Sequence, residues 1–118
     1  MMIKSRGIHI FALVMLLSGC VVTSDAGYYW GSYSKTYYAV LKNPTAENIL
    51  AHEDNLRNII KVSNERDLTV APGIQAELGY LLSKNSSNQE AVALYEKEAQ
   101  LYPESKIFLE RLLSDQKQ

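Results

Sequence analysis

The residue types that could support catalysis or metal binding are few in this 118-residue chain. Cys20 is the single cysteine, and His52 is the only histidine after the N-terminal segment. A hydrolytic site needs a nucleophile, a base and a group that orients the base, and His52 is the only candidate imidazole. A structural zinc site needs several Cys or His ligands. Glu96 and Glu98 are two residues apart, so on a helix they do not face each other. We therefore expect a protein that is not an enzyme and holds no metal or other cofactor.

The N-terminal segment has the pattern of a secretory signal. Lys4 and Arg6 precede an apolar run over residues 8–17, which is too short for a stable bilayer-spanning helix of roughly 20 residues. The run ends in Leu17-Ser18-Gly19-Cys20, which resembles the lipobox of bacterial lipoproteins. That resemblance implies cleavage before Cys20 and attachment of fatty acyl chains, such as palmitate, to its thiol. The alternatives are an uncleaved anchor or an ordinary signal peptide with an unrelated cysteine.

Cleavage at this motif defines the expected organisation of the chain. Residues 1–19 form the signal, 20–27 a lipidated tether, 28–113 a single helical domain and 114–118 a polar tail. The signal holds two of the twelve Lys and Arg residues and none of the thirteen Asp and Glu residues, which leaves the remaining 99 residues with a net charge of −3. Such a charge lacks the basic face of a nucleic-acid-binding protein. Several acyl chains together anchor a protein stably to a membrane. In Gram-negative bacteria, lipoproteins with Asp directly after the cysteine tend to stay at the inner membrane. Val21 is at that position here, so by analogy we expect the periplasmic face of the outer membrane.

Apolar residues recur at helical spacing along the whole of this domain. Asn43-Pro44 ends a first helix that starts near Trp30, and Thr45 is suited to cap the second. Pro72 is suited to the first position of the third helix, and Ser87 with Glu90 has the spacing of a capping box for the fourth. His52 falls beside the apolar side of the second helix, which predicts a half-buried structural residue. The expected helices cover residues 30–42, 45–64, 72–84, 87–102 and a short segment at 108–113.

The third and fourth predicted helices resemble a tetratricopeptide repeat, a helix–turn–helix unit of about 34 residues. Two small residues stand where the two antiparallel helices would approach most closely, larger residues surround that contact, and a proline ends the second helix. Gln75 and Glu98 depart from the repeat pattern, which has a tryptophan and a small residue at these positions. The residues that carry the match, and that we expect to pack the two helices together, are Leu78, Gly79, Ala91, Tyr95 and Pro103.

One repeat cannot bury its apolar faces alone, and about three are needed for stability. The two preceding helices can supply a degenerate first hairpin, and the last helix can cap the stack. The expected fold is therefore all-α, with tetratricopeptide-like antiparallel helical hairpins and about five helices. A stack this small is one that dimerisation or a bound partner would help to stabilise.

The order of features also resembles a family of uncharacterised small bacterial lipoproteins, described as a domain of unknown function. The resemblance covers essentially the whole chain after the signal and implies an envelope location. It also implies partners among other envelope lipoproteins, including one similar to the curli secretion pore protein, and it brings no known activity. The segments that carry it are Tyr28–Tyr33, Lys42–Thr45, Pro72–Tyr80 and Leu101–Ser105.

Four residues are the expected contacts for a partner. Tyr28 and Tyr29 lie outside the first helix and close to the lipid, so they are suited to an interfacial or contact role. In tetratricopeptide proteins the first helix of each repeat lines a peptide-binding face, which here implies Ala76, Tyr80, Ser83 and Lys84. Tyr80 and Lys84 are the strongest pair, although Tyr80 could equally be a packed residue. Trp30, Tyr33 and Tyr37 share one helical face and are expected to pack the first helix onto the stack.

These observations lead to one principal functional hypothesis and two alternatives. The principal hypothesis is an outer-membrane lipoprotein that acts as a protein-interaction scaffold, assembling or stabilising an envelope or secretion complex. Its lipid would raise the effective concentration of the domain for membrane-bound partners. The alternatives are a regulator of a cell-wall synthase and a lipoprotein that binds peptidoglycan or another glycan through its aromatic segment. No nucleic acid or small-molecule substrate is expected.

Overall fold

The computed structural model describes residues 27–85 and 87–115, and within them the chain is all-α, as the sequence predicts. The five α-helices of this part are α2 (Tyr33–Lys42), α3 (Ala46–Glu65), α4 (Ile74–Lys84), α5 (Asn88–Leu101) and α6 (Lys106–Asp115), and the 3₁₀ turn η1 (Pro103–Ser105) precedes α6. No helix of the described residues is long and apolar enough to cross a membrane. The expected signal and lipidation residues, Leu17, Ser18, Gly19 and Cys20, lie outside the described residues.

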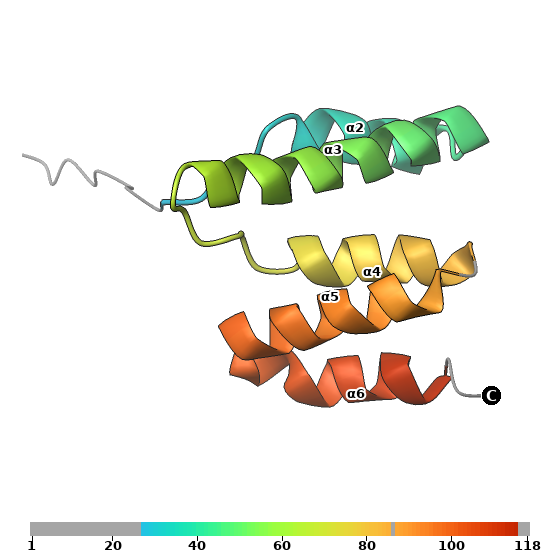
Figure 1. Ribbon diagram of the computed structural model, residues 1–118. Coiled ribbons are helices and arrows are strands. Elements are labelled where there is room, and N and C mark those ends of the chain that lie inside the picture. The colour runs from blue at the N-terminus through green and yellow to red at the C-terminus, as the bar shows by residue number, and fades with distance from the viewer. Residues whose placement is uncertain (1–26, 86, 116–118) are drawn as a thin grey trace, which may run out of the picture.

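The helices stack in chain order (Figure 1). α2 packs against α3, α3 against α4, α4 against α5 and α5 against α6. Two successive antiparallel hairpins, α2–α3 and α4–α5, are therefore followed by a fifth helix that covers α5. The buried apolar side chains belong to α3, to the loop that precedes α4, and to α4, α5 and α6: Leu56, Ile59, Val70, Ala71, Ile74, Leu78, Leu82, Ala91, Leu94, Tyr95 and Leu109. No residue of α2 is fully buried.

The boundaries of α2 and α3 follow from local backbone chemistry. The Thr45 side chain accepts a hydrogen bond from the Asn48 N–H at 3.2 Å, which confirms the predicted cap of α3. The predicted start of the first helix at Trp30 is wrong, because α2 begins at Tyr33. Gly31 has a φ of +49°, a left-handed conformation that interrupts a right-handed helix.

The predicted starts of α4 and α5 also need correction. Pro72 is not the first helical residue, because Gly73 has a φ of +88° and α4 begins only at Ile74. The capping box predicted for α5 does not form. Ser87 makes no side-chain cap bond, and the Glu90 carboxylate accepts hydrogen bonds from the Arg57 guanidinium of α3 instead. An ion pair between two helices has therefore taken the place of a bond within one.

Glu98 of α5 departs from the tetratricopeptide pattern, and in the structure it is buried and bonded to the start of α4. Its side chain is 2% exposed, and its Oε1 atom accepts a hydrogen bond from the Gly73 N–H at 2.6 Å. The carboxylate therefore fixes the left-handed turn at which α4 begins, because a charged acceptor strengthens a backbone hydrogen bond. A small side chain at this position would leave the Gly73 N–H without this acceptor.

Candidate functional site

A groove between α4 and α6 has a predominantly apolar lining. Its volume is about 400 Å³. Two aromatic side chains at its edge stay accessible, since Tyr80 is 46% exposed and Phe108 is 59% exposed. An apolar hollow with accessible aromatic side chains at its edge is a candidate binding site. The α4–α6 groove is lined by Gly73, Ala76, Glu77, Tyr80, Phe108 and Leu112.

A second hollow adjoins the groove and shares two of its residues, Tyr80 and Leu112. Its volume is about 310 Å³, and the Lys84 ammonium lies 4.9 Å from the centroid of the Tyr80 ring, in cation–π geometry. The structure therefore brings together the residues that the sequence analysis assigned to a peptide-binding face, which are Ala76, Tyr80, Ser83 and Lys84. Ala76 and Tyr80 line the groove, and Tyr80, Ser83 and Lys84 line the second hollow. The other residues of this hollow are Asn88, Tyr95, Leu112 and Asp115.

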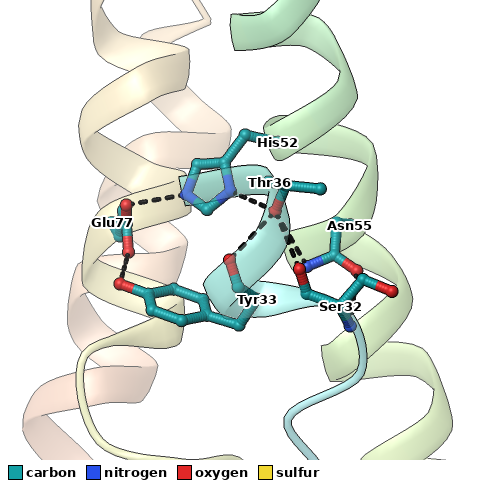
Figure 2. A network of polar contacts seen from close by, with 6 residues as sticks. All are labelled: Ser32, Tyr33, Thr36, His52, Asn55 and Glu77. Atoms are coloured by element: carbon teal, nitrogen blue, oxygen red, sulfur yellow. Dashed lines mark hydrogen bonds and ion pairs between the residues drawn. The ribbon is translucent and has the colours of Figure 1, made fainter. Parts of the chain in front are cut away.

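A network of polar side chains lies beside the groove and joins three helices (Figure 2). His52 of α3 is 2% exposed, and its Nε2 atom lies 2.8 Å from Oε1 of Glu77 on α4. Its Nδ1 atom lies 2.7 Å from the Thr36 hydroxyl of α2. The other Glu77 oxygen accepts a hydrogen bond of 2.8 Å from the Tyr33 hydroxyl, also on α2. Both ring nitrogens of His52 therefore have a polar partner, Glu77 at Nε2 and Thr36 at Nδ1.

Thr36, His52 and Glu77 have the residue types of a nucleophile, a base and a carboxylate that orients the base, but the Thr36 hydroxyl also has polar neighbours on either side. Thr36 Oγ1 also lies 3.2 Å from the carbonyl oxygen of Tyr33, in the same helix, and 3.3 Å from that of Ser32, the residue before the helix. Asn55 Nδ2 lies 3.4 Å from it on the other side. The network therefore joins α2 to α3 through Thr36 and His52, and to α4 through Tyr33 and Glu77.

Glu77 belongs to both features, and the sequence interpretation did not identify it. It lines the groove, yet both of its carboxylate oxygens already accept hydrogen bonds, from His52 and Tyr33. This arrangement leaves the groove with an apolar character despite the acidic residue in its wall. One sequence signal was available: Glu77 lies three residues after Ile74 and one before Leu78, on the apolar side of α4. Its partner His52 is 25 residues away, which no local pattern indicates.

The aromatic segment at residues 28–38 extends into α2 and contains both half-buried and exposed rings. Tyr28 and Tyr29 are half-buried and pack against the core, and the Tyr29 ring lies 5.0 Å below the Arg66 guanidinium. Trp30, Tyr37 and Tyr38 are the accessible members, at 45%, 40% and 64% exposure. Because α2 begins at Tyr33, Trp30 lies before the helix and does not share its packed face.

The rings of this segment form a ladder in which each contacts the next. The centroids of Trp30 and Tyr33 are 5.8 Å apart, and those of Tyr33 and Tyr37 are 5.5 Å apart with nearly parallel planes. Tyr33, in the middle, is the ring that bonds Glu77. The ladder is therefore linked through this bond to Glu77, which lines the α4–α6 groove.

Two tyrosines give the fold a predicted sensitivity to alkali. Burial, and then the hydrogen bond to Glu77, raises the pKa of Tyr33, and burial likewise raises the pKa of Tyr102, whose hydroxyl donates to the Val70 carbonyl. Above pH ~10 the unfolded chain loses these protons while the folded chain keeps them, so stability is expected to fall as the pH rises. The check is urea unfolding at pH 8 to 11, with Tyr33→Phe as the variant whose stability falls less steeply. Equal slopes for the two proteins would contradict the prediction.

With this geometry established, comparison with known proteins assigns the family. Residues 28–112 match the family model described as Domain of unknown function (DUF4810). The chain belongs to this family. No curated protein and no solved structure gives a significant match. The DUF4810 match confirms the predicted membership in a family described as a domain of unknown function, and it spans all five described α-helices except the last residues of α6.

Proposed function

We propose that this DUF4810 protein is a membrane-tethered protein-interaction module that docks a segment of a partner protein in the α4–α6 groove. Lipid at Cys20 would hold the domain on the periplasmic face of the outer membrane, where it would help to assemble or stabilise an envelope or secretion complex. The single observation that carries the docking role is the apolar groove of about 400 Å³ with exposed Tyr80 and Phe108 at its edge. Exposed aromatic side chains around a hollow are typical of protein interfaces.

The arrangement of hairpins supports a tetratricopeptide-like interpretation of this groove. A Cβ atom built on Gly79 would lie 3.2 Å from the Ala91 carbonyl and 2.8 Å from the Tyr95 ring, so α4 and α5 approach closely where the repeat pattern has small residues. Pro103 follows the end of α5 and is the first residue of η1, the turn that leads to α6. In such stacks the first helix of each pair lines the binding face, and the α4–α6 groove lies on that side.

Tethering supplies the mechanism of the proposed module. A lipid anchor confines the domain to a surface, so a partner in the same membrane meets it at a much higher effective concentration than in free solution. A groove of this size can then hold its partner with modest intrinsic affinity. The role needs no bond-making chemistry, which agrees with the engagement of Thr36, His52 and Glu77 by one another.

Site-specific photo-crosslinking in the producing cell tests this proposal. A benzoylphenylalanine in place of Phe108 or Tyr80 is expected to crosslink to a defined partner protein. The same group in place of Leu101, which is 43% exposed and lines a different hollow, serves as the matched control. Loss of the crosslinks in a Cys20→Ala variant would support the tether. Crosslinks that are absent at both groove positions, or equal at Leu101, would contradict the docking role.

The accessible ring ladder favours a second candidate function, the binding of a glycan. Trp30 and Tyr37 are partly exposed, and accessible aromatic rings can stack on sugar rings. Affinity for purified peptidoglycan that is lost in the Trp30→Ala, Tyr37→Ala double variant, and kept in Tyr80→Ala, would favour this function. Identification of a cell-wall synthase as the crosslinked partner would instead assign the docked complex to the regulation of wall synthesis.

A further inference from the structure

We infer that the occupant of the groove is an extended peptide segment with an apolar side chain and, two residues along, an acidic side chain. This inference rests on the proposed docking function and adds the chemistry of the partner to it. The groove and the second hollow adjoin each other at Tyr80 and Leu112, and they differ in polarity. A segment that crosses this boundary must therefore present two kinds of side chain in succession.

The apolar side chain belongs in the groove. Its lining includes Ala76, Tyr80 and Leu112, and its one carboxylate, that of Glu77, accepts bonds from His52 and Tyr33. A polar side chain placed there would lose its water and find few partners, which costs free energy, whereas an apolar side chain gains from burial. An aromatic or branched aliphatic residue therefore fits this position best.

The acidic side chain belongs beside Lys84 in the second hollow. Lys84 forms no ion pair within the described residues, and its ammonium is held over the Tyr80 ring at the boundary between the two hollows. α5 begins at Asn88 on the same hollow, so the positive end of its helix dipole adds to the Lys84 charge. Asp115 of α6 also lines this hollow and would repel a second carboxylate. The acidic side chain of the peptide is therefore expected on the α4 side of the hollow, next to Lys84.

The spacing of the two side chains follows from the position of the Lys84 ammonium and from strand geometry. The ammonium lies 4.9 Å from the centroid of the Tyr80 ring, and Tyr80 lines both hollows. In an extended chain, side chains at positions i and i+2 lie on the same face and are roughly 6.5 to 7 Å apart. An apolar residue in the groove therefore places the side chain two positions later next to the Lys84 ammonium.

Three fluorescent seven-residue peptides of Gly and Ser test this specificity. The first carries Phe at its third position and Glu at its fifth, the second has Lys in place of Glu, and the third has Ser in place of Phe. Anisotropy is measured with the full chain in lipid nanodiscs, and empty nanodiscs serve as the blank. The wild type is expected to bind the Phe–Glu peptide about three- to tenfold more tightly than the Phe–Lys peptide, the range for an exposed charge pair changed from attraction to repulsion.

The variants Lys84→Glu and Lys97→Glu decide whether Lys84 causes this preference. Both change the net charge equally, but Lys97 lines a different hollow. Reversal of the preference in Lys84→Glu alone supports the inference. Phe-dependent binding without a charge preference, or a preference for the Phe–Lys peptide that Asp115→Asn removes, overturns it and leaves the docking function intact. Absence of Phe-dependent binding to wild type also overturns it, and the crosslinks at Tyr80 and Phe108 then show separately whether the docking function stands.

Discussion

Replacing His52 with alanine is expected to lower the free energy of unfolding by about 3 kcal/mol. The change removes a fully buried ring and leaves a cavity, and it also takes away the partners of the Glu77 Oε1 atom and the Thr36 hydroxyl. The helix most affected is α2, because it has no fully buried residue of its own and polar contacts of Tyr33 and Thr36 join it to α3 and α4. α2 should therefore open before the remainder of the domain.

Hydrogen exchange together with urea unfolding checks both parts of this prediction. In the His52→Ala variant, the α2 amides should exchange much faster while those of α5 keep most of their protection. His52→Gln is the matched variant, because an amide can donate to Glu77 and accept from Thr36 and should recover part of the stability. Uniform loss of protection across α2 and α5 would show that the network does not hold α2 in particular.

Replacing Gly79 with valine is expected to destabilise the α4–α5 hairpin by about 3 kcal/mol, and replacing it with alanine by about 1–2 kcal/mol. A Cβ atom at Gly79 would lie 2.8 Å and 3.0 Å from two carbons of the Tyr95 ring and 3.2 Å from the Ala91 carbonyl. The ring is completely buried and the carbonyl is backbone, so neither can move away without separating the helices. This cost exceeds the gain of roughly 1 kcal/mol that alanine brings to a helix interior.

A double-mutant cycle identifies the obstructing group. Gly79→Ala combined with Tyr95→Leu should cost about 1 kcal/mol less than the sum of the two single changes, because the smaller side chain removes part of the overlap. Ala93→Val provides a control on an exposed position of α5, where a branched side chain meets no opposing helix. It should lower the free energy of unfolding by only about 0.5 kcal/mol. Strict additivity in the cycle would mean that the ring is not the obstacle.

The segments between the helices show which sequence signals were sufficient. The Thr45 cap and the end of α2 before Pro44 depend on neighbouring residues, and the sequence predicted both correctly. The capping box at Ser87 failed because Glu90 found Arg57, which is 33 residues away in sequence. The start of α4 at Ile74 depends on Glu98, which holds the Gly73 N–H from another helix. A local pattern cannot indicate a competing partner that only folding brings close.

The sequence by itself determined the all-α class, the succession of helices and the family. Helical periodicity and helix-ending residues act over one or two turns, so they can be recognised in a single chain. The sequence also predicted the pairing of Tyr80 with Lys84 from helical spacing, since the two residues are one helical turn apart. Only the tertiary structure decided that Phe108 of α6 faces Tyr80 across a groove, and that His52 binds Glu77 between α3 and α4. These contacts join residues far apart in sequence, and their geometry is set by how whole helices pack.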